Sequence, residues 1–160
     1  MEMPVSLFFW LFAIALSIHV VEESTVGGGF VNMVKSQLWP DYNHKKFFWF
    51  NAICYIFFAV SIIVYELWAG AWIVLPLSFA WMLVTNGFWH VIGTAFSKRY
   101  SPGLITSPIY WILMYFLIRY GLLKDQIDMT DFVISIVVGS LVTVLMVGSM
   151  FAMGRKSKID

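Results

Sequence analysis

Residues 4–26 read PVSLFFWLFAIALSIHVVEESTV. An apolar helix of about 20 residues, rising about 1.5 Å per residue, crosses the hydrocarbon core of a bilayer, which is about 30 Å thick. No basic segment precedes this stretch, no small-residue cleavage motif follows it, and it runs into Glu22 and Glu23. We therefore interpret it as a membrane span and not as a removable signal peptide.

Four further apolar stretches are bounded by Gly, Pro or polar residues, and they cover about 47–67, 71–96, 104–123 and 132–153. The pattern predicts an all-α membrane protein in which residues 1–160 form one domain, a bundle of five transmembrane helices. The composition agrees, since 61% of the residues are apolar and 12% are charged, whereas about 25% are charged in an ordinary soluble domain. A free soluble globule is excluded.

The distribution of basic residues predicts the orientation, because cytoplasmic loops collect Lys and Arg. With five spans, eight of the ten basic residues share the side of the C-terminus, and only Arg119 and Lys124 lie on the other. The eight are Lys35, Lys45, Lys46, Lys98, Arg99, Arg155, Lys156 and Lys158. We expect a multi-pass protein of the cell membrane with the N-terminus outside and the C-terminus in the cytoplasm. A net charge of +1 without a concentrated basic face excludes a nucleic-acid partner.

Three of the spans carry polar residues that a bilayer disfavours, and the one in the second span is Asn51, near its cytoplasmic end. Ionisable side chains at membrane depth are rare and usually face a bundle interior. His19, Glu22 and Glu23 lie three and four residues apart on one face of the first span, and Asn86 and His90 lie four apart in the third. Both histidines lie about 10 Å before the cytoplasmic ends of their helices. We expect a shared pocket, with the histidine side chains within about 10 Å of each other.

A short loop, Tyr100-Ser101-Pro102-Gly103, follows the third span. Pro fixes φ and Gly accepts positive φ, so Pro102-Gly103 suits the centre of a type II turn. The loop reverses the chain and lets the fourth span pack against the third. Functionally, the Tyr100 hydroxyl is a candidate donor above the pocket.

Together these motifs resemble those of the HXXEE-domain family of small integral membrane proteins, which are HxxEE, a second histidine and YxPG. His19-Val-Val-Glu22-Glu23 matches the first, His90 is the candidate for the second, and Tyr100-Ser101-Pro102-Gly103 matches the third. The resemblance supports the choice of residues. It implies no reaction, because the family has no settled activity.

The first functional hypothesis is a metal-dependent enzyme that acts on a lipid-like or apolar substrate. His19 and His90 with Glu22 or Glu23 would supply two imidazoles and a carboxylate for a divalent metal, zinc or iron, with a position left open. The other glutamate would be the general base. The candidate catalytic residues are His19, Glu22, Glu23, Asn86, His90 and Tyr100.

Other hypotheses need no metal. Paired carboxylates with shifted proton affinities would serve an acid/base isomerase or cyclase acting on an apolar substrate. A chain of His and Glu would also serve as a proton or ion relay, or belong to a regulatory membrane subunit. The remaining alternative is a purely structural role, in which these side chains only form hydrogen bonds between helices. Each such bond contributes about 0.6 kcal/mol to stability, which is little for placing two carboxylates and two histidines in a bilayer. Membrane lipids are the expected partners in every case.

Overall fold

The computed structural model describes residues 4–68 and 70–156, and every regular element within them is helical. The predicted all-α class is therefore confirmed. The elements are α1 (Ser6–Thr25), the 3-10 turn η1 (Val26–Gly28), α2 (Phe30–Gln37), α3 (His44–Leu67), α4 (Val74–Ser97), α5 (Ser107–Leu123) and α6 (Met129–Lys156).

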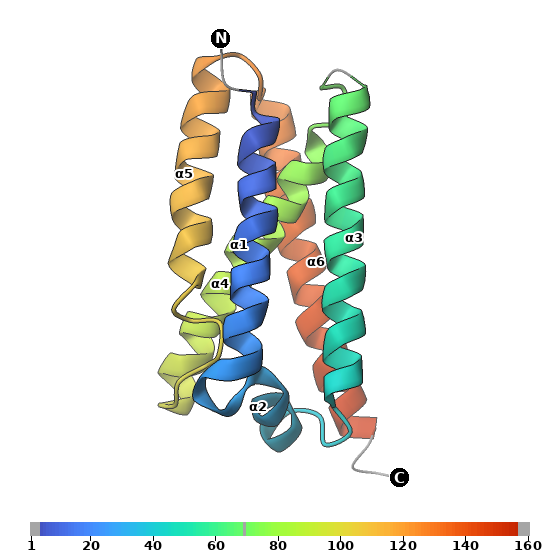
Figure 1. Ribbon diagram of the computed structural model, residues 1–160, viewed down its shortest axis with the longest axis vertical. Coiled ribbons are helices and arrows are strands. Elements are labelled where there is room, and N and C mark those ends of the chain that lie inside the picture. The colour runs from blue at the N-terminus through green and yellow to red at the C-terminus, as the bar shows by residue number, and fades with distance from the viewer. Residues whose placement is uncertain (1–3, 69, 157–160) are drawn as a thin grey trace.

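Five long helices lie side by side and alternate in direction (Figure 1). Helices α1, α4 and α6 run toward one end of the bundle, which is lower in Figure 1 and is called the lower end below; α3 and α5 run away from it. Helix α1 contacts α3, α4 and α5, and α4 packs along α6. The bundle core is apolar and includes the fully buried rings of Phe9, Phe12 and Tyr110.

The predicted spans differ from the observed helices by three residues or fewer at each end. Within the described part of the chain, four helical segments are long and apolar enough to cross a membrane, namely Ser6–Gly28, His44–Leu67, Val74–Ser97 and Met129–Lys156. Helix α5 is apolar but has only 17 residues. The fifth crossing and the orientation remain predictions, and Lys158, used for the orientation, lies outside the described residues.

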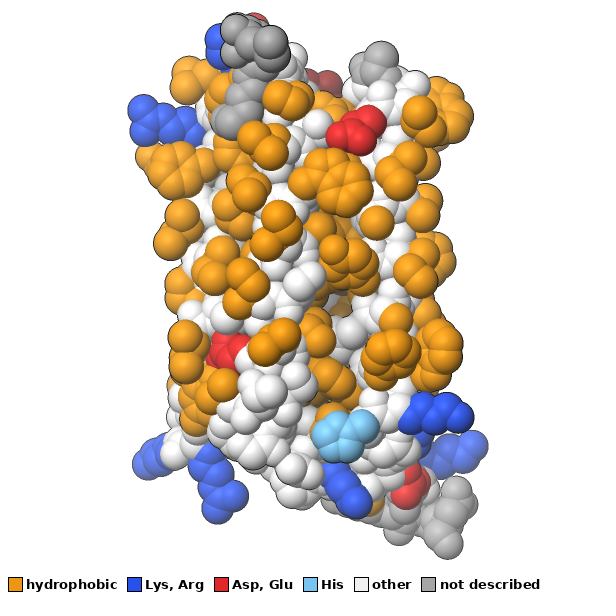
Figure 2. Space-filling model, viewed as in Figure 1, with side chains coloured by type: hydrophobic (Ala, Val, Ile, Leu, Met, Phe, Trp, Pro, Cys, Tyr) orange, Lys and Arg blue, Asp and Glu red, His pale blue; other side chains and the backbone are white. Residues whose placement is uncertain are grey.

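The outer surface of the bundle is apolar, as lipid contact requires. Figure 2 shows hydrophobic side chains over most of the length of the visible face, with Lys and Arg near its two ends. Leu67, Phe96 and Leu123 are exposed by 71%, 86% and 73%. Soluble monomers rarely expose contiguous apolar surface on this scale, so the surface is that of a membrane protein.

Helix α2 was not predicted from the sequence. It follows three glycines, Gly27, Gly28 and Gly29, with φ of 65°, 85° and 82°. Glycine adopts this left-handed region without steric cost, so the chain turns sharply at the end of α1. Helix α2 then lies at the lower end of the bundle (Figure 1) and buries Phe30 and Val34. This short helix closes the lower end beneath the polar residues of α1 and α4.

The contact between α6 and α4 depends on small residues. A Cβ atom on Gly139 would meet the backbone of α4, with Met82 N at 2.8 Å. Thr143 is 3% exposed, and its hydroxyl donates to the Met82 carbonyl at 3.1 Å. Gly148 lies further along α6, and a Cβ atom placed on it would meet no atom within 4 Å.

We expect Gly139→Ala to lower the free energy of unfolding by about 2 kcal/mol, because a methyl group pressed against backbone cannot be relieved by a side-chain rotation. The matched change Gly148→Ala should stabilise the protein by up to about 1 kcal/mol, since alanine favours the helix. Unfolding of the purified protein in mixed micelles measures both. Equal effects of the two substitutions would contradict the close packing of α6 on α4.

Candidate functional site

The polar residues of α1 and α4 meet inside the lower half of the bundle. His19 and Glu23 come from α1, and Asn86 and His90 come from α4. His19 and His90 are each 1% exposed, and their ring centroids lie 5.0 Å apart. The convergence predicted from the equal depth of the two histidines is therefore found.

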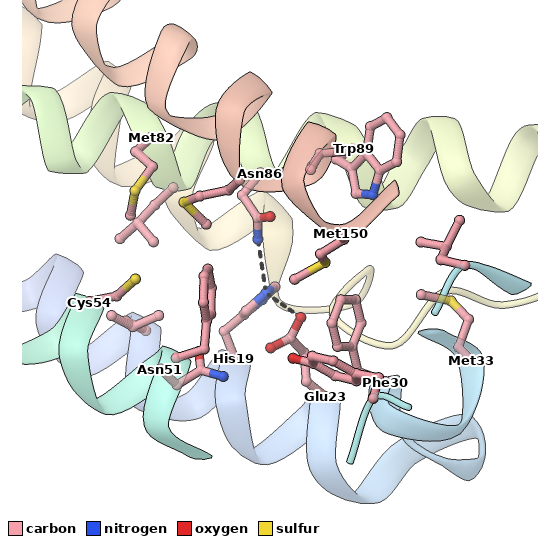
Figure 3. Close-up of a pocket in the computed structure, with 17 residues that line it drawn as sticks. His19, Glu23, Phe30, Met33, Asn51, Cys54, Met82, Asn86, Trp89 and Met150 are labelled. Atoms are coloured by element: carbon pink, nitrogen blue, oxygen red, sulfur yellow. Dashed lines mark hydrogen bonds and ion pairs between the residues drawn. The ribbon is translucent and has the colours of Figure 1, made fainter. Parts of the chain in front are cut away.

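Both imidazoles direct Nε2 toward the Glu23 carboxylate. Glu23 Oε1 lies 3.6 Å from His19 Nε2 and 3.5 Å from His90 Nε2. The Asn86 side-chain amide lies on the other side, 3.4 Å and 3.2 Å from the same two nitrogens. Figure 3 shows Asn86 and Glu23 pointing toward His19 from opposite sides. The two nitrogens and the carboxylate oxygen thus face a common point.

The opposite ring nitrogens are held by hydroxyl groups. His19 Nδ1 lies 2.7 Å from Thr106 Oγ1, and His90 Nδ1 lies 3.1 Å from Ser101 Oγ. Thr106 directs its own hydroxyl hydrogen to the Gly103 carbonyl, and Ser101 directs its hydrogen to the sulfur of Met33. Both hydroxyls are then acceptors for Nδ1–H, which leaves a lone pair on each Nε2. The Asn86 amide is consistent with this tautomer because it donates to both Nε2 atoms.

Glu22 points away from this cluster, toward the loop that precedes α5. Its carboxylate accepts hydrogen bonds from the backbone N–H groups of Gly103 at 3.0 Å, Ile105 at 3.0 Å and Thr106 at 2.8 Å. It also accepts one from the Tyr100 hydroxyl. Non-helical backbone at membrane depth needs internal partners, and the carboxylate also complements the positive end of the α5 dipole. Glu22 therefore fixes the loop and is not among the residues that face the two Nε2 atoms.

The Tyr100 side chain, a predicted donor above the pocket, lies over the end of α1. Burial and the hydrogen bond to Glu22 raise the pKa of Tyr100 above its ordinary value, so the hydroxyl remains a donor. Its ring packs on Gly27, where a Cβ atom would overlap it. Tyr100 thus supports Glu22 and the turn into α2.

Gly103 brings the loop against both histidines. Its φ of 105° is the positive value that the predicted Pro-Gly turn requires. A Cβ atom here would lie 2.7 Å from His19 Cε1 and 2.7 Å from His90 Nε2. Only glycine lets the backbone approach the imidazoles this closely, which gives a physical reason for the last residue of the YxPG motif.

An apolar cavity opens from this cluster into the bundle. We call it the central cavity; its volume is about 60 Å³. His19, Glu23, Asn51 and Asn86 form its polar part, with the Asn51 amide donating to the Phe47 carbonyl. Several of its walls are methionines from different elements, as Figure 3 shows for Met33, Met82 and Met150. The other lining residues are Leu16, Phe30, Leu38, Tyr42, Phe50, Cys54, Leu83, Trp89, Met146 and Val147.

Some residues of the site were missed at the sequence level. Thr106 and Ser101 orient the histidines, but no sequence spacing identifies a hydroxyl in a loop as the partner of a histidine in a distant helix. Phe30 covers His90 with its ring centroid 6.1 Å away, and Tyr42 lines the central cavity. The signal for both was the glycine triplet, which turns residues 30–42 back under the bundle.

The geometry of the cluster suits a metal ion. One ligand atom from each of His19, Glu23 and His90 lies within 4.8 Å of the others, and all three residues are buried. Ligands about 2.05 Å from a tetrahedral ion lie about 3.4 Å apart, close to the observed separations of 3.5 and 3.6 Å. Each histidine has an orienting hydroxyl on its other nitrogen, as metal-ligating histidines usually do.

The fold and the site define a class, a small helical membrane protein with two histidines and a carboxylate buried beside an apolar cavity. A family model described as "Protein of unknown function with HXXEE motif" matches residues 10–118. The chain belongs to this family. The match includes the three motifs and ends within α5, so α6 lies outside it. No curated protein and no solved structure matched the chain.

Proposed function

We propose that His19, Glu23 and His90 bind a divalent metal ion, zinc or iron, and that the protein is a membrane-embedded enzyme for an apolar, lipid-like substrate. One observation carries the metal: two nitrogen lone pairs and a carboxylate oxygen converge in a buried site. Such electron-rich atoms repel one another; the Asn86 amide offsets part of this repulsion by donating to both Nε2 atoms, and a cation among them would offset the rest. A metal held by two histidines and one carboxylate keeps a position open, where it polarises a carbonyl or activates water.

The surroundings of the site support an apolar substrate. The central cavity is largely hydrophobic and lies among helices that are long enough to cross the bilayer. Asn86 lies beside both Nε2 atoms, where its amide would orient a polar group of the substrate. The site therefore combines a few convergent polar atoms with apolar walls, the usual composition of a small-molecule site.

We also propose that all five long helices cross the cell membrane, with the N-terminus outside. Helix α5 lies alongside the other four, and α1 begins at the end opposite to that where α6 finishes, as an odd number of crossings requires (Figure 1). Most basic residues of the sequence fall in segments at the lower end, which would face the cytoplasm.

The metal-free alternatives receive less support from the geometry. Two carboxylates share a proton only when they lie side by side at one site. Glu22 and Glu23 instead have different partners, the loop before α5 for the first and the histidines for the second. A relay would need a polar path to both ends of the bundle, whereas the central cavity is bordered by apolar residues.

Elemental analysis of detergent-purified protein tests the metal, with wild type beside His19→Ala and His90→Ala. We expect close to one zinc or iron per chain in wild type and almost none in either variant. His44→Ala is the matched control, because His44 is exposed at the start of α3. Absence of metal from folded wild type, even after chelation and metal add-back, would refute the metal centre.

Removing an orienting hydroxyl should weaken metal binding without changing a ligand. We expect Thr106→Val and Ser101→Ala each to lower the affinity for zinc about tenfold or more, because each frees the Nδ1 side of one imidazole. Competition with a chromogenic chelator measures this affinity. Ser36→Ala, a change at an exposed hydroxyl of α2, should have no effect; equal affinities for all four proteins would contradict the assignment.

A further inference from the structure

We propose that the central cavity binds the uncharged, oxygen-bearing head of a single-chain amphiphile, that Tyr42 donates a hydrogen bond to this oxygen, and that the chain leaves sideways between α1 and α3 into the bilayer. This inference deepens the proposed function and rests on it for the chemistry. The hydrogen bond to the head and the path of the chain involve residues other than the three metal ligands, so the binding is testable without a metal.

Tyr42 supplies the first argument. It lies between α2 and α3, is 3% exposed and lines the central cavity. Its hydroxyl is buried and has no hydrogen-bond partner among the described residues. Burial, with a smaller contribution from the Glu23 carboxylate, raises the pKa of Tyr42, so the group stays protonated. A buried donor without an acceptor costs about 1–3 kcal/mol, and a bound oxygen atom would remove that penalty.

The charge of the lining identifies the kind of head. Among the described residues that line the central cavity, Glu23 is the only one with a formal charge. In the metal-free protein, a phosphate or free carboxylate would find no Lys or Arg there and would face Glu23 directly. An alcohol, aldehyde or ester oxygen needs only a donor, which Tyr42 provides.

The size of the central cavity shows why most of the chain must lie outside it. A cavity of about 150 Å³ binds benzene, and this one measures about 60 Å³. It therefore takes a head and the first carbons of a chain, not a whole lipid. Its methionines adapt readily to such a guest, because their side chains are flexible and polarizable.

A second hollow continues from the first. We call it the α1–α3 groove; its volume is about 450 Å³, and it shares Leu16 and Asn51 with the central cavity. Figure 2 shows this face of the molecule hollowed between the two helices. The other lining residues are Ser17, Val20, Ser24, Phe47, Phe48, Ala52 and Tyr55. The groove is mostly apolar and faces the surroundings of the bundle, so an alkyl chain would pass from the site into the bilayer along it.

Photolabelling tests this path. The probe is hexadecanol with a diazirine in the distal half of its chain, added to chelated protein in lipid nanodiscs, and labelled peptides are identified by mass spectrometry. We expect labels on the groove residues of α1 and α3. A separate hollow between α4 and α6, lined by residues that include Phe88, Thr143 and Gly148, offers the competing path, and labels confined to it would overturn the proposal.

Three substitutions make the test specific. Tyr42→Phe removes only the hydroxyl, and we expect about three- to tenfold weaker labelling. Ala52→Trp fills the α1–α3 groove and should reduce labelling at least tenfold, whereas Ile53→Trp, on a side chain 50% exposed on the same helix, should leave it unchanged. If Ala52→Trp does not fold, Ser17→Leu narrows the opposite wall.

Two comparisons separate this inference from the metal proposal: probes with an alcohol head against probes with an acid head, and variants with and without the metal ligands. The palmitic acid analogue, ionised at neutral pH, should label chelated protein at least fivefold less than the alcohol does; stronger labelling by the acid would refute an uncharged head. Loss of hexadecanol labelling in His90→Ala alone, with Tyr42→Phe unaffected, would also overturn it. Labelling that persists in protein shown to bind no metal would leave this inference standing while the metal centre fails.

Discussion

Replacing Glu22 with alanine is expected to be the most destabilising single change in this protein. The substitution removes the acceptor of three backbone N–H groups in the loop before α5, those of Gly103, Ile105 and Thr106. Each buried donor left without a partner costs about 1–3 kcal/mol, so the total loss is about 3–9 kcal/mol. Folded proteins are stable by only about 5–15 kcal/mol, and the variant should be largely unfolded or aggregated after solubilisation.

A graded pair of variants tests this explanation. Glu22→Gln keeps one oxygen acceptor and should lose about half as much stability as Glu22→Ala. Glu66→Gln is the matched control, because Glu66 is exposed and the hydrogen bond that it accepts from Trp10 is exposed too. Thermal unfolding and the monodisperse fraction in size-exclusion chromatography measure the series. Equal melting temperatures for Glu22→Ala and Glu66→Gln would show that the carboxylate does not support the loop.

The second large effect is expected for Gly103→Ala. The new methyl group would lie 2.7 Å from both imidazoles, and φ of 105° is unfavourable for any residue with a side chain. The loop and the histidines must then separate, which we expect to lower the free energy of unfolding by about 3 kcal/mol and to weaken metal binding more than tenfold. Denaturation in mixed micelles and chelator competition measure the two effects.

Gly28→Ala is a close control for this change. Gly28 also has positive φ, 85°, but no atom lies within 4 Å of a Cβ placed on it. It should therefore show only the conformational penalty, about 1 kcal/mol, with metal affinity unchanged. Should the two alanine variants behave alike, backbone strain alone would account for Gly103, and the close contact with the histidines would be irrelevant.

The helices were largely predictable because hydrophobic length is a local property of the sequence. The long apolar runs gave boundaries within three residues of those observed. One of the three-residue differences has a clear cause, the start of the fourth predicted span at residue 104, where α5 begins at Ser107. Leu104 and Ile105 continue the apolar pattern of the span, yet Gly103 at positive φ and the bonds to Glu22 keep residues 104–106 outside α5. Long-range contacts decided that boundary, and no local pattern reports them.

The site was predictable in depth but not in the direction of each side chain. Equal depth correctly brought His19 and His90 together. Adjacent residues of a helix point about 100° apart, so Glu22 and Glu23 had to separate, yet the sequence did not say which faces the histidines. That choice depends on where the loop before α5 lies. Tyr42 escaped prediction because α2, the helix that precedes it, is only eight residues long, and so short an apolar face was not recognised as a helix in the sequence.

The bonds between Glu22 and the loop before α5 also bear on how the chain is made. Glu22 and Thr106 are 84 residues apart, and synthesis at about 5–20 residues per second takes about 4–17 s to cover that distance. During this interval α1 has been made, but the donors that neutralise its carboxylate have not. We therefore expect α1 to reach its final packing only after the loop before α5 has been made, because Glu22 lacks these hydrogen-bond donors until then.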